Sequence, residues 1–148
     1  MKKVYIMRGI SGAGKSTYIK NNLSNLPDSI ICSADNFFMK DGKYEFDISL
    51  QKESHKFCLQ EFITAIQSGK ENVICDNTNV VVWQLSPYVC IAEAFGYEVE
   101  IIEIHITAEL AAQRTLHGRT EKDLKGTLFA MNQKLPRAWK VKKIQATI

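Results

Sequence analysis

The chain has 148 residues, of which 45% are hydrophobic and 24% charged, and this size and composition are typical of one globular domain. A net charge of +3 is too small to indicate a nucleic-acid-binding protein by itself. Every apolar run falls far short of the roughly 20 residues that span a bilayer. The short run before Arg8 leads into a glycine-rich loop, so we expect neither a membrane helix nor a signal peptide.

Strand-like apolar runs alternate with helical patterns in the first half of the chain. The elements predicted there are a buried strand over residues 4–7, a helix over 16–23, a short buried strand over 30–33, a loop covering a site over 35–47 and a long helix over 49–67. Gly69 is expected to end the long helix, because glycine readily adopts the backbone conformation that follows a helix.

The alternation continues in the second half. The predicted elements are a strand over residues 73–75 that ends at Asp76, a helix over 82–95, a fourth strand over 99–106, a helix from 109 to about 116 and a final helix over 121–134. Glu100 and Glu103 interrupt the apolar pattern of the fourth strand. This predicts that both carboxylates are exposed and that the strand lies at an edge of the sheet.

The segment between the first strand and the first helix matches the Walker A motif in full: it reads Gly9-Ile10-Ser11-Gly12-Ala13-Gly14-Lys15-Ser16. The glycines let backbone N–H groups turn toward an anion, and the following helix points its positive end at the same place. Lys15 should reach the β- and γ-phosphates of ATP, and the Ser16 hydroxyl should bind Mg²⁺. The residues predicted to bind ATP are Gly12, Ala13, Gly14, Lys15, Ser16 and Thr17.

These elements together predict an α/β protein with a P-loop NTPase-type three-layer fold and a central parallel sheet of about four strands. We expect residues 1–148 to form a single kinase domain with a lid over about 114–122. Cys32 and Cys75 fall inside predicted strands, and the four cysteines show no zinc or Cys-x-x-Cys spacing. This cysteine pattern favours a reducing, cytoplasmic setting.

Two aspartates follow predicted strands, at the edge of the sheet where open parallel sheets bind their ligands. Asp35 lies just beyond the second strand, where it is suited to take the proton from an attacking hydroxyl, although a capping or turn role would explain it as well. Asp76 ends the third strand, as the Mg²⁺-binding aspartate of a Walker B segment does.

Polar groups and arginines complete the candidate site. Asn77 and Asn79 either orient the acceptor or brace Asp35, or simply form a turn and cap the next helix. Arg114 and Arg119 lie on either side of Gly118, as expected of a lid whose arginine stabilises a transferring phosphoryl group, or of a solvent-facing basic turn. His55 is predicted to lie at the surface.

The C-terminal stretch is basic. Between positions 134 and 143 it carries Lys134, Arg137, Lys140, Lys142 and Lys143 and no acidic residue. Such a stretch is either a patch that binds a polyanion or a solvated face.

The segments Gly9–Thr17, Ser33–Asp35, Asp76–Asn79 and Arg114–Thr120 together resemble the 5′-hydroxyl polynucleotide kinase family. They also resemble kinase-like P-loop modules of larger eukaryotic proteins and of bacterial and phage chains, to which Tyr44–Asp47, His55 and Pro87–Val89 are closer. The resemblance extends from about Lys3 to Met131. It implies that ATP phosphorylates a 5′-OH end of DNA or RNA, with Asp35 as the general base and Arg119, or else Arg114, as the lid arginine.

The chain departs from that family at two places. Phe38 stands where these kinases often have an arginine that holds a substrate phosphate, so an aromatic ring would stack on a base there, or the acceptor is not a nucleic acid. The spacing of the lid arginines is shifted by about one residue. The chain also lacks the Asp-x-Asp-Gly motif of a phosphatase, so the resemblance implies a kinase domain alone.

Three functions fit the sequence. The first is a 5′-OH polynucleotide kinase in nucleic-acid repair. The second is a small-molecule kinase acting on a nucleoside, sugar or antibiotic hydroxyl, in which Phe37, Phe38 and Tyr44 would line a closed pocket. The third is a non-catalytic ATP-binding module whose nucleotide state orders a loop for a partner. The sequence does not fix the oligomeric state.

Overall fold

The computed structural model describes residues 2–115 and 118–146. The elements are β1 (Lys3–Arg8), α1 (Lys15–Asn22), β2 (Ser29–Cys32), the 3₁₀ helix η1 (Ala34–Phe38), β3 (Met39–Lys40), β4 (Lys43–Tyr44), the 3₁₀ helix η2 (Ile48–Leu50), α2 (Gln51–Gln67), β5 (Asn72–Asp76), α3 (Val82–Ala94), β6 (Glu98–His105), α4 (Ala108–Arg114), α5 (Glu121–Ala130) and β7 (Val141–Gln145).

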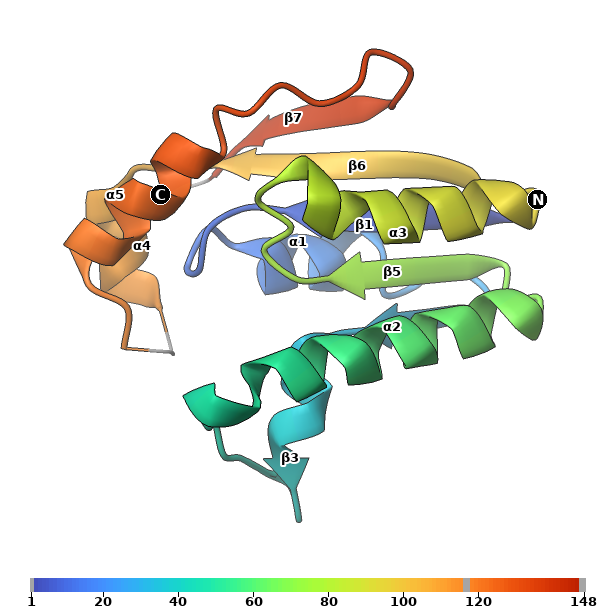
Figure 1. Ribbon diagram of the computed structural model, residues 1–148, viewed down its shortest axis with the longest axis horizontal. Coiled ribbons are helices and arrows are strands. Elements are labelled where there is room, and N and C mark those ends of the chain that lie inside the picture. The colour runs from blue at the N-terminus through green and yellow to red at the C-terminus, as the bar shows by residue number, and fades with distance from the viewer. Residues whose placement is uncertain (1, 116–117, 147–148) are drawn as a thin grey trace.

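The main sheet has five strands in the order β2-β5-β1-β6-β7, and each pairing between neighbours is parallel. The strand order reverses around the central strand β1, since the chain first builds one side of it and then crosses to the other. Ligands of such sheets bind beyond the carboxyl ends of the strands at this reversal. Figure 1 shows the loop after β1 and the helices α4 and α5 gathered at that end.

Helices cover both faces of the sheet, which confirms the predicted α/β three-layer fold. Phe62 of α2 and Leu85 of α3 are fully buried in the core on one face. Ile19 of α1, Ala111 of α4 and Leu124 of α5 are buried in the core on the other face. Figure 1 shows α2 and α3 in front of the sheet and α1 behind it. Cys32 and Cys75 are buried, as predicted.

The fifth strand, β7, was not predicted, and its presence changes the place of β6. β7 pairs with β6 from Ile101↔Val141 to His105↔Gln145, so β6 is an interior strand and the predicted edge position is wrong. The sequence of β7 reads VKKIQ, and its lysines suggest a solvated stretch. Lysines on an exposed strand protect the edge of a sheet against pairing with another chain. Part of the basic C-terminal stretch is therefore the edge strand of the sheet.

Glu103 is buried, with 5% of its surface exposed, and the prediction that it is exposed is wrong. Its carboxylate forms a buried ion pair with Arg8, the last residue of β1. The two residues lie opposite each other in the β1–β6 register, so the guanidinium compensates the carboxylate inside the sheet.

The predicted loop over residues 35–47 contains η1 and the short antiparallel hairpin of β3 and β4. Asp41 and Gly42 connect the two strands, both with positive φ (50° and 78°), as in the two-residue turns that match the twist of a hairpin. The predicted last helix also ends earlier, at Ala130. Within residues 2–115 and 118–146, none of the helices is long and apolar enough to span a membrane.

We predict that Glu103→Ala lowers the free energy of unfolding by about 3–5 kcal/mol, because it leaves the Arg8 charge buried without its partner. Urea denaturation followed by circular dichroism measures this change. Glu98→Ala is the matched control, since the exposed Glu98 pairs with Lys140 at the surface and its loss should cost at most about 1 kcal/mol. Equal effects of the two variants would contradict the proposed role of the buried pair.

Candidate active site

The P-loop joins β1 to α1 and takes the shape that phosphate binding requires. Gly12 and Gly14 have φ of +83° and +101°, a region that favours glycine. Gly14 is the N-cap of α1, so the positive end of this helix opens onto the loop. The N–H of Gly9 donates to the Thr78 carbonyl at 3.0 Å, which ties the start of the loop to the segment after β5.

Gly12 is also needed for packing. A Cβ atom at this position would lie 2.4 Å from the carbonyl oxygen of Ala111 in α4. Only a residue without a side chain lets the P-loop approach α4 this closely. The motif therefore fixes both the phosphate site and the position of the helix that leads to the predicted lid.

Lys15 lies across the P-loop, where its ammonium group donates to the carbonyls of Gly9 (2.9 Å) and Ile10 (3.0 Å). Burial lowers the pKa of Lys15 to about 8, while the carboxylates of Asp76 and Asp35 act in the opposite direction. Phosphates of a nucleotide would supply further negative charge and stabilise the ammonium form.

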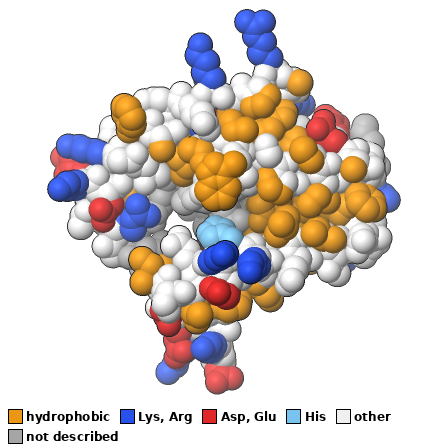
Figure 2. Space-filling view, in the orientation of Figure 1, with side chains coloured by type: hydrophobic (Ala, Val, Ile, Leu, Met, Phe, Trp, Pro, Cys, Tyr) orange, Lys and Arg blue, Asp and Glu red, His pale blue; other side chains and the backbone are white. Residues whose placement is uncertain are grey.

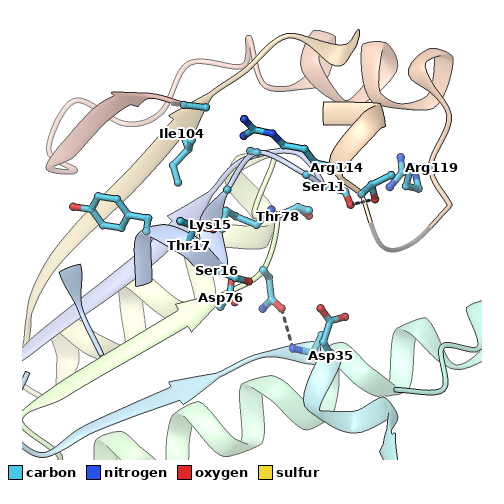
Figure 3. Close-up of a pocket in the computed structure, with 18 of the residues that line it drawn as sticks. Ser11, Lys15, Ser16, Thr17, Asp35, Asp76, Thr78, Ile104, Arg114 and Arg119 are labelled. Atoms are coloured by element: carbon cyan, nitrogen blue, oxygen red, sulfur yellow. Dashed lines mark hydrogen bonds between the residues drawn. The ribbon is translucent and has the colours of Figure 1, made fainter. Parts of the chain in front are cut away.

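A cleft of about 1200 Å³ opens at the carboxyl ends of the strands, and Figure 2 shows the hollow in the molecular surface. It is larger than the roughly 300–1,000 Å³ typical of a site for one small ligand. The predicted site residues that line it are Gly12, Ala13, Gly14, Lys15, Ser16, Thr17, Asp35, Phe38, Asp76, Asn77, Arg114 and Arg119. Figure 3 shows Asp35 on the wall opposite the P-loop, with Arg114 and Arg119 on the α4–α5 side.

Ser16 and Asp76 both line the cleft at the end of β5 and fit the predicted Mg²⁺ site. Burial raises the pKa of Asp76, and the nearby Lys15 ammonium opposes this shift. Within the described part of the chain, no group of three or more His, Cys, Asp or Glu residues is arranged to hold a metal. One hydroxyl and one carboxylate suit Mg²⁺, which takes most of its remaining ligands from phosphates and water.

Asp35 lies in the first turn of η1, and its position is fixed by neighbours on both sides. The cap of η1 is Ser33, whose hydroxyl accepts from the Asp35 N–H at 3.2 Å, so the capping role considered for Asp35 belongs to Ser33. The Asn77 amide oxygen accepts from the Ala34 N–H at 2.9 Å and ties η1 to the end of β5. The Tyr44 hydroxyl donates to Asp35 Oδ1 at 3.2 Å.

Three of the predicted substrate residues have other contacts. Asn77 is buried and braces the Asp35 segment, which is one of the roles predicted for it. Asn79 does not line the cleft: its amide donates to the Met7 carbonyl, and the residue is 4% exposed. Phe38 borders the cleft but is only 3% exposed, because its ring packs edge-on against Phe46, so it does not offer a face to a base.

A short contact joins the predicted lid segment to the P-loop. The hydroxyls of Ser11 and Thr115 are 2.6 Å apart, directly after α4. Arg114 is the last residue of α4, and Figure 3 shows its side chain above the P-loop. Arg119, which precedes α5, donates to the hydroxyl of Thr127 in α5 at 3.2 Å. Of the predicted lid, residues 116–117 lie outside the described residues.

The side of the cleft that carries Asp35, which we call the acceptor wall after the role predicted for Asp35, contains residues that were not among the predicted site residues. Phe46 (44% exposed), Ile48 and His55 line the cleft on the side of Asp35. His55 is exposed, as predicted, and partial burial of its ring lowers its pKa, with Asp35 opposing. The Walker A motif could not predict Phe46 as a site residue, because the position of Phe46 depends on the β3–β4 hairpin. The aromatic residues around Tyr44 were the feature of the sequence that could have indicated it.

The sequence model of the AAA domain family matches residues 4–133. The human protein NEDD4-binding protein 2 is 28% identical over 123 residues, which are 80% of this chain and 7% of that protein. The chain thus spans a small part of the length of this curated relative.

Several solved structures have a similar fold. A chain in the structure of the Pnkp1/Rnl/Hen1 RNA repair complex has a TM-score of 0.70 at 19% identity, and the match covers 94% of this chain and 49% of that chain. A gluconokinase from Sinorhizobium meliloti 1021 has a TM-score of 0.63 at 13% identity and covers 99% and 83%. At these identities the likeness shows the fold alone.

We predict that nucleotide affinity weakens as pH rises above about 8, because the lowered pKa of Lys15 makes it lose its charge there. Fluorescent ATP-analogue titrations between pH 6.5 and 9.5 measure the dissociation constant. In Lys15→Arg, which stays charged over this range, the rise in dissociation constant above pH 8 should disappear. A pH dependence that persists unchanged in this variant would contradict the assignment to Lys15.

Proposed function

Because the chain belongs to the AAA domain family and forms a kinase-type P-loop domain, we propose that it transfers the γ-phosphate of ATP to the 5′-OH end of DNA or RNA. The observation that carries this proposal is that Asp35 and the P-loop line one cleft from opposite walls. The cleft has room for a nucleotide donor and an acceptor together. A chain of an RNA repair complex has a similar fold, so the fold is compatible with a nucleic-acid acceptor.

The residues around the cleft suit direct transfer between two bound substrates. Asp35 takes the proton of the acceptor hydroxyl as its oxygen attacks the γ-phosphorus; the new O–P bond forms while the bond from the γ-phosphorus to the bridging oxygen of ADP breaks. Lys15 and the P-loop N–H groups hold the phosphates in line. Mg²⁺, held by Ser16 and Asp76, would neutralise charge on the phosphates. Arg119 or Arg114 would balance the charge of the transferring group.

Phe46 replaces Phe38 as the candidate for contact with a base. It is 44% exposed, lines the cleft, and its ring contacts the edge-on ring of the buried Phe38, with ring centroids 5.1 Å apart. An aromatic face supported in this way suits stacking of a base or nucleoside.

A small-molecule acceptor is the second candidate, and the charge of the acceptor wall favours it. Residues 36–56 carry four lysines (40, 43, 52 and 56) and four acidic residues (41, 45, 47 and 53), so this wall has no excess positive charge for a phosphate backbone. The gluconokinase fold shows that the same architecture exists in a sugar kinase.

The free cysteines of the described residues fit the proposed cytoplasmic setting.

We predict that the Asp35→Asn variant loses at least about 100-fold in phosphate transfer, since the amide cannot accept the proton, while ATP binding is retained. Transfer of ³²P from γ-labelled ATP to 5′-OH single-stranded RNA and DNA measures this loss. Asp41→Asn is the matched control, because Asp41 lies in the hairpin turn, away from the cleft lining, and asparagine tolerates its positive φ.

Each outcome of that assay separates the candidate functions. Label on the oligonucleotide that is lost in Asp35→Asn would establish the proposed kinase. Label on a nucleoside or sugar but not on oligonucleotides would establish the small-molecule kinase. ATP binding without transfer to any acceptor, unchanged in Asp35→Asn, would contradict both and leave a binding module.

We predict that Phe46→Ala raises the KM for the oligonucleotide at least about fivefold and leaves the KM for ATP unchanged, because a stacked base loses about 1–3 kcal/mol. Steady-state kinetics with each substrate varied in turn measures the two constants. Phe95→Ala is the control, since Phe95 is a similarly exposed phenylalanine after α3 that does not line the cleft. An unchanged KM for the oligonucleotide would refute stacking on Phe46.

A further inference from the structure

A side chain from the hairpin that follows Asp35 donates a hydrogen bond to its carboxylate. The Tyr44 hydroxyl lies 3.2 Å from Asp35 Oδ1, although the two residues are nine positions apart. The wall of the cleft that carries the proposed base therefore includes a second polar group, which the phosphate-binding motif does not contain.

The hairpin sets the position of Tyr44. In the β3–β4 ladder Tyr44 pairs with Met39 and Lys43 with Lys40, and the left-handed Asp41 and Gly42 close the turn. The Glu45 N–H donates to the Phe38 carbonyl at 2.9 Å, which joins the end of the hairpin back to η1. A register shift of one residue would turn the Tyr44 side chain to the other face, away from Asp35.

Aromatic contacts hold the ring of Tyr44 on two sides. Phe38 meets it edge-on with ring centroids 6.2 Å apart, and Phe46 lies nearly parallel to it at 6.4 Å with planes 18° apart. Phe38 is anchored in the protein interior, with 3% of its surface exposed. The ring of Tyr44 is thus packed on a fixed base, and the place of its hydroxyl follows from that packing.

Tyr44 remains a hydrogen-bond donor over the working range of an enzyme. Burial raises the pKa of the Tyr44 hydroxyl well above its ordinary value, and the nearby Asp35 carboxylate raises it further. A protonated phenol can only donate to an ionised carboxylate, so the direction of this hydrogen bond is fixed.

We propose that Tyr44 is a positioning residue for phosphate transfer, whose hydroxyl holds the Asp35 carboxylate in the orientation that receives the proton of the acceptor hydroxyl. This inference rests on the proposed kinase function. In the transfer step Asp35 takes the acceptor proton, and Tyr44 keeps its own. The hydrogen bond to Oδ1 restrains rotation of the carboxylate, and misplacement of a catalytic group by about 1 Å costs up to roughly 100-fold in rate.

Tyr44→Phe tests the inference because it removes the hydroxyl and keeps the ring packing. We expect kcat to fall about 10-fold or more, with the KM for ATP and the melting temperature unchanged. Tyr97→Phe is the matched control: Tyr97 is a packed tyrosine whose hydroxyl donates to the Lys70 carbonyl at 2.6 Å, beside the amino end of β6. Its kcat should equal that of the wild type.

The outcomes distinguish this inference from the proposed function. If the wild-type protein phosphorylates its acceptor and Tyr44→Phe has the same kcat, Tyr44 does not position Asp35, while the kinase assignment stands. A fall in kcat that comes with a lower melting temperature and a higher KM for ATP would assign Tyr44 to packing alone and overturn the inference. If the wild type transfers phosphate to none of the acceptors, the proposed function itself fails.

Discussion

The buried guanidinium of Arg8 connects the parts of the molecule that form the site. Arg8 is the last residue of β1 and directly precedes the P-loop. It pairs with Glu103 of β6, donates to the carbonyls of Asn79 and Val80 after β5, and reaches the Met131 carbonyl at the end of α5. A charge with 2% exposure is tolerated only where such partners are all in place. Three strands and α5 are therefore fixed around the start of the P-loop.

The two walls of the cleft are built in different ways. The P-loop wall rests on the central strand and on the close approach of Gly12 to α4, so its geometry is set by the core. The acceptor wall includes η1, the short β3–β4 hairpin and the residues that follow it. Of these, η1 is tied to the sheet through the hydrogen bond between Ala34 and Asn77. Regions with few buried contacts open at low free energy. Residues 39–50 on this side of the cleft are exposed, so side-chain bonds such as Tyr44 to Asp35 contribute much of the order there.

The sequence predicted those parts of the site that depend on local patterns. A full Walker A motif defines the P-loop. An aspartate at or just beyond the end of a parallel strand has to lie at the carboxyl edge of the sheet, as Asp76 at the end of β5 and Asp35 after β2 do, although β2 is an edge strand with Ile31 40% exposed rather than the buried strand predicted. Glu103 was predicted wrongly because its partner Arg8 is 95 residues away, and no local pattern contains that pairing. β7 was not predicted because its two lysines break the apolar pattern by which buried strands are recognised, although lysines are common on edge strands.

The acceptor wall has no excess of basic residues, since the four lysines of residues 36–56 are balanced by four acidic residues. Lys140 of the C-terminal stretch forms ion pairs with Glu98 and Glu100. Lys142 and Lys143 lie on β7, which is the edge strand opposite to β2, the strand that leads into η1. An enzyme that modifies only the end of a strand needs to hold the terminal nucleoside, and the proposed stacking on Phe46 would supply contact without phosphate charges. A nucleoside-like small molecule presents the same ring and hydroxyl, which explains why one acceptor wall suits both candidate substrates.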